Sequence, residues 1–283
     1  MFLSKNTYLQ SLFWLLLSIF ASCLNDLVTK LLITELPSCQ VCFFRFILGS
    51  LVLVPIMYYK GKYAFKTQRL FLHILRGLFL SIGMGLYAYS LTKITISSAT
   101  VIGFTNPIFV LILARIFLKE VVAWPIWMAT LCTCVGMALI LRPTTYSSAA
   151  LSCILATVVF ASLDIINKKY VAYEPILSML FFSNLVASCC MLPVACYYWK
   201  VPTLFELSFL GILGIGSNLI LYFLLKAFQQ SKVASLAPMK YTEWVLSILL
   251  GYLFFQEWPT LTAFLGAAII ISSTCFILYY QNR

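Results

Sequence analysis

Long apolar runs separated by short polar segments follow one another along the whole chain. Ten runs can be delimited, at roughly residues 10–33, 37–59, 71–92, 96–118, 123–142, 147–168, 175–198, 204–228, 232–254 and 259–280. Each is close to the length of about 20 residues that a helix needs to cross a bilayer. The runs are continuously apolar and do not alternate, which excludes an outer-membrane β-barrel. We therefore predict an all-α membrane protein with ten transmembrane helices.

Composition narrows the class of protein. Of the 283 residues, 63% are hydrophobic and 10% are charged, whereas soluble domains carry about 25% charged residues. Ten spans leave no room for a soluble nucleotide-binding domain, and the sequence has no G-x-x-x-x-G-K-[ST] motif. ATP-driven pumping by this chain alone is not expected. The first run is long and lacks a small-residue cleavage site, so we expect a retained span and not a signal peptide.

The net charge of +11 is distributed unevenly between the ends of the predicted spans. With the N-terminus placed in the cytoplasm, most Lys and Arg residues fall at inner ends. The outer ends hold only Lys30, Lys93, Arg142 and Lys200. This positive-inside bias predicts that both termini are cytoplasmic. It also explains the excess of basic residues, so we expect no nucleic-acid partner.

Cysteine and histidine do not suggest catalysis or a cofactor. The ten cysteines lie mostly inside apolar runs, and His73 is the single histidine. Neither zinc-like spacing nor an H-E-x-x-H or G-x-S-x-G motif is present. We expect no catalytic residue, no metal site and no cofactor, and we interpret these residues as packing residues. A membrane-embedded enzyme is the weakest of the alternatives.

The second half of the chain repeats the first. Asp26-Leu-Val-Thr-Lys30 matches Asp164-Ile-Ile-Asn-Lys168 at a numbering offset of 138. Further along, Thr105-Asn106-Pro107 aligns with Thr242-Glu243-Trp244 at an offset of 137. An ordered series of matches indicates an internal repeat.

We divide the chain into two five-helix repeats, residues 1–143 and 144–283. Because five is an odd number, the second copy enters the membrane from the opposite side. Inverted repeats of this kind are found in many secondary transporters, whose substrate site lies near the midplane at the repeat interface. The pattern predicts a transporter that works by alternating access.

The stretch Met239–Trp244 places two charges inside a run that we expect to be helical from about Val233 to Phe255. A charge at bilayer depth costs at least ~2.5–3.5 kcal/mol. Lys240 and Glu243 are three residues apart and would share a helix face, so a structural ion pair is one interpretation. The other is a substrate-binding site flanked by Tyr241 and Trp244. Polar groups in other spans favour the binding site.

Three further polar residues are candidates for the same site. Arg45 lies about two turns into the membrane, where its planar fork suits a carboxylate. A salt bridge from Arg45 to Asp26 is the structural alternative. Asn106 is the repeat mate of Glu243, and Pro107 beside it is expected to loosen the helix at mid-depth.

Acid–base pairs recur at the ends of the first and sixth spans. Inversion would place Asp26 with Lys30, and Asp164 with Lys168, on opposite sides of the membrane. Lys30, Asp164 and Lys168 are therefore candidates for gates that each close one face. Helix-end pairing and snorkelling are the alternative, which we favour for Lys168.

The chain resembles the drug/metabolite transporter superfamily, in particular its EamA-type members. Glu120 and Glu257, which end the fourth and ninth spans, carry part of the resemblance. More specific strings are similar to those of S-adenosylmethionine carriers of rickettsia-like intracellular bacteria. These strings are Phe43-Phe44-Arg45-Phe46, His73-Ile-Leu-Arg-Gly77, Leu163-Asp-Ile-Ile-Asn-Lys-Lys169 and Phe223-Leu-Leu-Lys-Ala-Phe228. The resemblance implies an inner-membrane carrier that imports S-adenosylmethionine in exchange for S-adenosylhomocysteine. An exporter of amino acids, drugs or related metabolites is the alternative.

This ligand gives the candidate residues expected roles. Arg45 or Lys240 would bind the carboxylate, and Glu243 or Asp26 would face the amino group or the sulfonium. Asn106 would read an edge of the adenine. The aromatic candidates for stacking on the adenine, or for cation–π contact with the sulfonium, are Trp244, Tyr241 and Phe44. Exchange or proton coupling, and a monomer or a homodimer, are left open by the sequence.

Overall fold

The computed structural model describes residues 5–61, 65, 67, 69–94, 99, 102–103, 105–140, 148–236, 239–240, 242–255, 265, 268–269, 272–273 and 276. Throughout this part of the chain the regular structure is helical, and no strand occurs in it. The expected all-α class is therefore confirmed. The tenth apolar run falls mostly outside the described residues.

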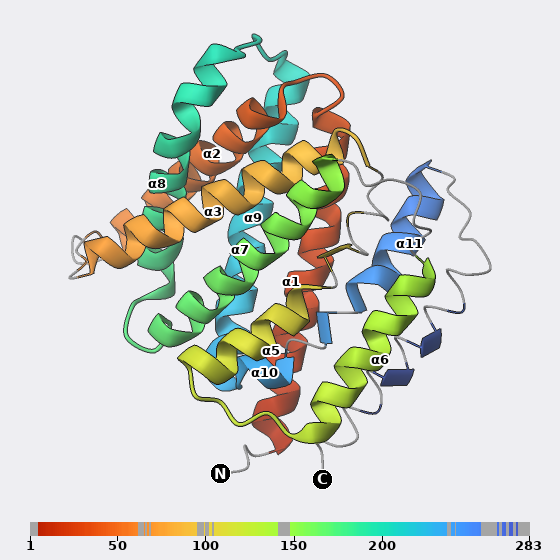
Figure 1. Ribbon diagram of the computed structural model, residues 1–283. Coiled ribbons are helices and arrows are strands. Elements are labelled where there is room, and N and C mark those ends of the chain that lie inside the picture. Colours follow the sequence, from red (N-terminus) through yellow and green to blue (C-terminus); the bar gives the residue numbers. More distant parts are fainter. Residues whose placement is uncertain are drawn as a thin grey trace.

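Six of the helices are long and apolar enough to cross a membrane. They are α1 (Lys5–Leu32), α2 (Ser38–Tyr59), α3 (Leu70–Leu91), α7 (Ser148–Tyr170), α8 (Ile176–Tyr197) and α9 (Leu204–Gln230), shown in Figure 1. Shorter helices are α5 (Asn106–Phe117), α6 (Trp124–Ile140), α10 (Val233–Leu236) and α11 (Thr242–Phe255). Continuous apolar sequence forms helices here because lipid offers no partner for the backbone, which a helix satisfies internally.

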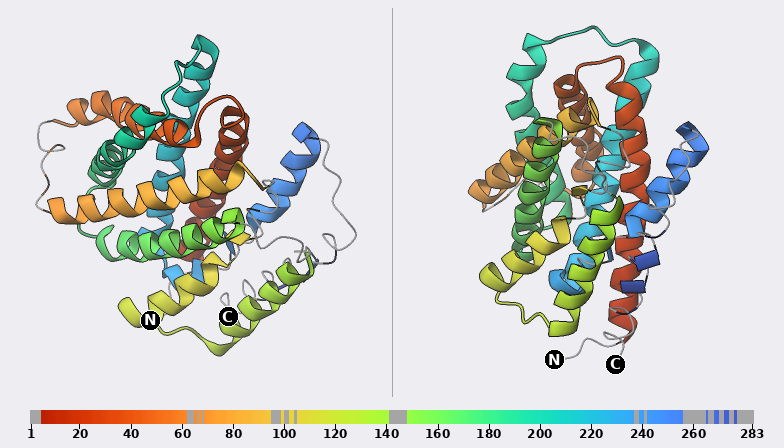
Figure 2. Two further views of the ribbon diagram at one scale, coloured as in Figure 1. Left: turned by 45° about the horizontal axis from the view of Figure 1, so that its top comes forward. Right: turned by 45° about the vertical axis from the view of Figure 1, so that its right-hand side comes forward.

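The long helices pack in pairs that join the two halves of the chain. α1 lies along α9, α3 along α7, and α2 along α8. Figures 1 and 2 show α1 rising from the N-terminus while α9 descends beside it. Crossings of α3 with α8 and of α2 with α9 complete the bundle. Since each of these pairings takes one helix from each half, the two halves are interlocked and do not form separate bundles.

Glycine allows close approach at the two crossings. A Cβ added at Gly77 of α3 would lie 2.5 Å from the Cβ of Val186 on α8. A Cβ added at Gly214 of α9 would lie 2.8 Å from the backbone nitrogen of Gly49 and 3.1 Å from the carbonyl carbon of Leu48, on α2. Membrane helices commonly pack through small residues. Gly77 and Gly214 are repeat mates, as are Leu48 and Val186, so the two crossings correspond.

The ammonium group of Lys30 binds the C-terminal end of another helix. Its Nζ donates to the carbonyl oxygen of Leu91 at 2.6 Å and to that of Ile94 at 2.9 Å, where α3 ends. The last carbonyls of a helix lack partners within the helix, and a cation there also complements the helix dipole.

Lys168, the repeat mate of Lys30, makes the matching contact in the second half. Its Nζ donates to the carbonyl oxygen of Phe228 at 2.5 Å and to that of Ser231 at 2.7 Å, at the end of α9. Phe228 and Ser231 are themselves the repeat mates of the two residues that accept from Lys30. Both lysines therefore hold helix ends through the same pattern of bonds.

Asn106 and Pro107 lie where the fourth apolar run is interrupted. Asn106 is the first residue of α5, Thr105 before it forms a turn, and Pro107 lies in the first helical turn. Ile102 and Gly103 before this turn are helical, so the predicted loosening of the fourth span beside Pro107 agrees with the structure. Proline costs nothing at this position because its missing N–H would have no intrahelical acceptor.

The expected continuous helix from Val233 to Phe255, by contrast, is wrong. α10 ends at Leu236, Met239 and Lys240 form a 3₁₀ turn, and α11 begins at Thr242. The sequence carries Pro238 in this interval, and proline disfavours the helical conformation of the residue before it. Within α10, the Ala234 N–H donates to Oε2 of Glu120 at 3.1 Å.

We expect Gly214→Ala to destabilise the protein, because the new methyl group would meet the backbone of α2. Overpacking of this kind costs about 1–3 kcal/mol. Gly211→Ala in the same helix is the matched control, since a Cβ at Gly211 meets no described atom within 4 Å. Thermal unfolding of both purified variants in detergent gives the comparison. Equal melting temperatures would contradict the close crossing of α2 and α9.

Candidate functional site

A cavity of about 260 Å³ lies between the helices of the two halves. Its wall includes parts of α1, α2, α3, α5, α7, α8 and α9, together with the turn before α11. Its polar lining residues are Ser22, Asp26, Arg45, Tyr87, Asn106, Thr157, Asp164, Asn167, Asn184, Ser217, Lys240 and Glu243. A cavity of this polarity in a bundle of apolar helices is a binding-site candidate.

Five ionisable side chains give the cavity its charge. Asp26, Asp164 and Glu243 are carboxylates, whereas Arg45 and Lys240 are cations. With all five ionised, the cavity carries one excess negative charge. It therefore suits a ligand with both an anionic and a cationic group and one net positive charge.

Lys240 forms an ion pair with Asp164, the aspartate that lines the cavity from the second half of the chain. Its Nζ lies 2.5 Å from Oδ2 of Asp164 and 3.4 Å from Oδ1 of Asn106. The alternative of a Lys240–Glu243 pair on one helix face does not hold, because Lys240 precedes α11 in the 3₁₀ turn. Asn106 also donates from Nδ2 to the carbonyl oxygen of Thr157 at 3.1 Å. Lys240 thus links the broken ninth run to α5 and α7.

Asp26 and Arg45 face the same cavity without forming a salt bridge in the described part of the chain. Oδ2 of Asp26 accepts from the hydroxyl of Tyr87 at 3.1 Å. Arg45 is only 8% exposed. Oriented for its best hydrogen bonds, the Asn25 side chain accepts from Arg45 Nη2 at 3.2 Å. Nε and Nη1 of Arg45 have no partner among the described residues.

These two nitrogens of Arg45 are buried donors of a residue that lines the cavity. Leaving a buried polar group unsatisfied is costly, particularly a charged one. A carboxylate accepts two parallel bonds from a guanidinium. Arg45 is therefore well suited to bind an anionic ligand group.

Glu243 lies in the first turn of α11 and faces α1. Its carboxyl group is hydrogen-bonded to Ser22 and lies near Asp26 and Lys240. Its backbone oxygen is 3.7 Å from the sulfur of Cys23. Glu243 thus brings a second carboxylate to the side of the cavity that holds Asp26.

The lining of the cavity follows the repeat. Most of the wall consists of aligned positions from both halves, at the two offsets that define the repeat. The pairs are Ser22 with Phe160, Asp26 with Asp164, Phe46 with Asn184, Leu80 with Ser217, Met84 with Leu221, Tyr87 with Leu224, Gly103 with Lys240, and Asn106 with Glu243.

The structure brings most of the expected site residues together. Glu243, Lys240, Arg45, Asn106 and Asp26 all line the cavity, as does the gate candidate Asp164. Tyr241 and the side chain of Trp244 lie outside the described residues. Phe44 is not part of the lining, and its ring packs against that of Trp199, 5.6 Å away between centroids. The gate candidates Lys30 and Lys168 lie at helix ends, also outside the lining.

Several lining residues are missed by the sequence reasoning. Tyr87 falls where an interfacial aromatic belt is expected, and Phe160 and Asn184 show no signal of their own. The rings of Tyr87 and Phe160 meet edge to face, with centroids 6.5 Å apart. The repeat does not identify them either, because their mates Leu224, Ser22 and Phe46 are not site candidates in the sequence.

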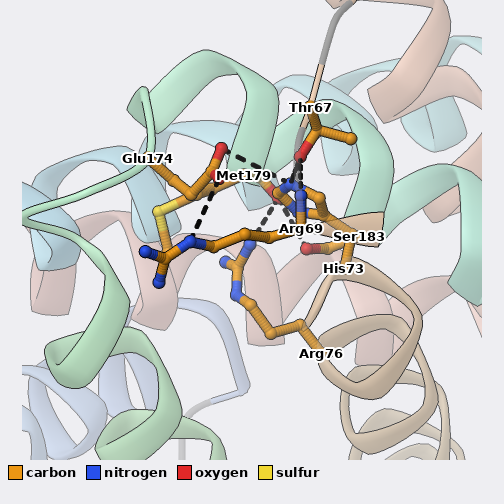
Figure 3. Close-up of polar contacts among 7 residues, drawn as sticks. All are labelled: Thr67, Arg69, His73, Arg76, Glu174, Met179 and Ser183. Carbon is orange, nitrogen blue, oxygen red and sulfur yellow. Dashed lines mark hydrogen bonds and ion pairs between the residues drawn. The ribbon is translucent and has the colours of Figure 1, made fainter. Parts of the chain in front are cut away.

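A second polar cluster joins α3 to the turn between α7 and α8, shown in Figure 3. Nε2 of the buried His73 lies 3.0 Å from Thr67 Oγ1 and 3.8 Å from Glu174, which is also 3.9 Å from Arg69 Nε. Figure 3 also includes Arg76, whose Nη1 donates to the carbonyl oxygen of Met179 at 2.7 Å.

Arg76 connects this cluster to the cavity. Its Nε donates to Oδ1 of Asn167 at 2.7 Å, and Asn167 lines the cavity wall. Arg76 is only 1% exposed, so its interactions are made inside the protein. The cluster therefore holds α3 against α7 and α8 at one end of the cavity.

Known proteins resemble this chain over most of its length. The EamA-like transporter family model matches residues 9–142 and 147–279. The chain is 44% identical over 279 residues to the S-adenosylmethionine uptake transporter of Rickettsia conorii, covering 98% of this chain and 95% of the relative. It is 26% identical over 254 residues to the pseudopaline exporter of Pseudomonas aeruginosa, covering 88% and 89%.

A solved crystal structure matches with a TM-score of 0.77 and 15% identity, covering 98% of both chains, which shows a shared fold. The family model matches twice and accounts for nearly all of the sequence. This chain therefore belongs to the EamA-like transporter family.

Proposed function

We propose that this protein imports S-adenosylmethionine across a bacterial inner membrane in exchange for S-adenosylhomocysteine. The observation that carries the proposal is the cavity, with its free arginine donors, its carboxylates and one excess negative charge. S-adenosylmethionine bears a carboxylate, an ammonium and a sulfonium, and hence one net positive charge. The similarity to a rickettsial transporter named for uptake of this compound supports the same ligand.

The cavity offers a partner for each part of this ligand. Arg45 offers an unpartnered guanidinium nitrogen to the carboxylate, while Asp26 and Glu243 face the cationic groups. Lys240 is engaged with Asp164, which makes Arg45 the better carboxylate site. The faces of Tyr87 and Phe160 are additional candidates for contact with the adenine.

The internal repeat would provide the movement that alternating access needs. In this proposal ten spans form two inverted five-helix repeats, residues 1–143 and 144–283, with both termini in the cytoplasm. The paired lysine contacts and the paired cavity lining support it. Lys30 and Lys168 would then hold helix ends near opposite faces of the membrane. They and Asp164 remain candidates for gates, because opening one face requires contacts there to break.

Proteoliposomes preloaded with S-adenosylhomocysteine test the proposed exchange. We expect uptake of labelled S-adenosylmethionine to be several-fold faster than in empty vesicles, since the returning carrier is then loaded. Transport without and with a pH gradient is measured in the same preparation. Dependence on the gradient alone would contradict exchange and indicate proton coupling.

The same experiment separates the other functions. No uptake and no competition by S-adenosylhomocysteine would favour an exporter, a function found in the family through the pseudopaline relative. Intact ligand is expected inside the vesicles, whereas a modified product would indicate an enzyme. Protein-free vesicles provide the background.

Glu243→Gln is expected to weaken binding of S-adenosylmethionine about 10- to 100-fold. The substitution keeps the shape but removes a charge, and a charge-assisted contact is worth about 1.5–3 kcal/mol. Folded yield should change little, because Lys240 is paired with Asp164 and is not stranded by the change.

The exposed acid Glu35 gives the matched control as Glu35→Gln. Affinity and folded yield are measured on the same preparations. Normal affinity in a well-folded Glu243→Gln sample would remove Glu243 from the site. Poor yield with normal affinity would instead assign Glu243 a structural role.

A further inference from the structure

The two aspartates of the cavity differ in their partners, although they are repeat mates. Asp164 is bonded to the ammonium of Lys240. In the alignment of the two halves, Asp164 corresponds to Asp26, whereas Lys240 corresponds to Gly103. All four residues line the cavity. The first half therefore has the aspartate without the lysine.

No residue that the structure describes fills the space beside Gly103. A Cβ built on Gly103 would meet no described heavy atom within 4 Å. A Cβ at Gly83 is far more restricted by comparison, since Phe160 would lie 2.8 Å away from it. The backbone at residue 103 can therefore be approached from the cavity by a group of the size of a side chain.

Asp26 lacks a directly bonded cation in the described part of the chain. The hydroxyl of Tyr87, a neutral donor, binds its carboxylate at 3.1 Å. Arg45 is close enough to attract Asp26 but forms no salt bridge with it. Glu243 adds a further negative charge from α11. Carboxylates removed from water are stabilised by a paired cation, so this side of the cavity attracts one.

From these observations we infer that a cationic group of the transported ligand binds between Asp26 and Gly103. It takes the place that the Lys240 ammonium occupies beside Asp164 in the second half. This inference rests on the proposed function and assigns one subsite within it. The ligand cation thereby forms with Asp26, in the first half, the ion pair that Lys240 forms with Asp164 in the second half.

The neighbouring charges set the orientation of the ligand. Arg45, on α2, provides free donors for the carboxylate, whereas Asp26 and Glu243 provide negative charge for the cation. In the second half, Lys240 is held by Asp164 and Asn106 and does not compete for Asp26. The amino-acid end of the ligand therefore lies against the first half, with its carboxylate toward Arg45.

Gly103→Lys tests the inference by attaching a cation to the protein at this place. By the repeat relationship its ammonium would reach Asp26, as Lys240 reaches Asp164. Gly103→Met is the matched control, because its side chain has a similar length without the charge. Binding of labelled S-adenosylmethionine to each purified variant is measured, with folded yield from size exclusion.

We expect Gly103→Lys to bind at least about tenfold more weakly than Gly103→Met. Equal binding by the Lys and Met variants would overturn the inference. If the unaltered protein binds no S-adenosylmethionine, the proposed function itself fails. The two failures are thus distinguishable within one experiment.

Asp26→Asn is the second variant, and it adds no bulk if Gly103→Lys does not fold. Weaker binding of S-adenosylmethionine alone would identify the bound cation as the sulfonium. Weaker binding of both S-adenosylmethionine and S-adenosylhomocysteine would identify the ammonium, which both compounds carry. Unchanged binding of both compounds by a folded Asp26→Asn protein would overturn the inference.

Discussion

The cost of charge inside an apolar bundle is the constraint on which the rest of this structure depends. Five ionisable side chains face one cavity, surrounded by helices with almost no other charge near the middle of their length. One pair, Asp164 with Lys240, is neutralised within the protein. On the other side, Asp26 and Arg45 are close but form no salt bridge within the described residues, and Glu243 adds negative charge. In the proposed function, a ligand with opposite charges at the correct spacing would stabilise these groups and so couple binding to the organisation of the bundle.

Broken helices follow from the same constraint. A backbone that leaves the helical conformation in a membrane must find polar partners, and a polar cavity is one of the few places that provide them. α5 and α11 both begin beside the cavity, at Asn106 and next to Glu243. The first N–H groups of a helix have no acceptor within the helix, and Asn106 and Glu243 in these first turns line the cavity. The prolines in the sequence here, Pro107 and Pro238, make a break less costly than elsewhere along the span.

Sequence reasoning predicted the helical class and most of the charged residues that line the cavity, because each depends on a local signal. Asp26, Arg45, Lys240 and Glu243 were visible as charges inside apolar runs. The failures concern geometry that such signals do not contain. Lys240 was placed on a helix face with Glu243 because the apolar run is continuous, although Pro238 within it disfavours an unbroken helix. Phe44 and Phe46 are equally apolar and adjacent to Arg45, and only the packing of α2 decides that Phe46 faces the cavity.

Duplication explains why some repeat mates are identical and others differ. Lys30 and Lys168, Gly77 and Gly214, and Asp26 and Asp164 are identical pairs; the first two hold helix ends and close crossings in the two halves. In the proposed inverted arrangement, equivalent contacts in both halves make two conformations with exchanged roles similar in free energy, as alternating access requires. A cavity with strict twofold symmetry would fit an asymmetric ligand poorly, however. Several repeat mates that differ in residue type line the cavity. In the alignment of the two halves, Gly103 corresponds to Lys240 and Asn106 to Glu243. The scaffold therefore keeps the symmetry needed for movement, while the lining loses the symmetry that would prevent recognition.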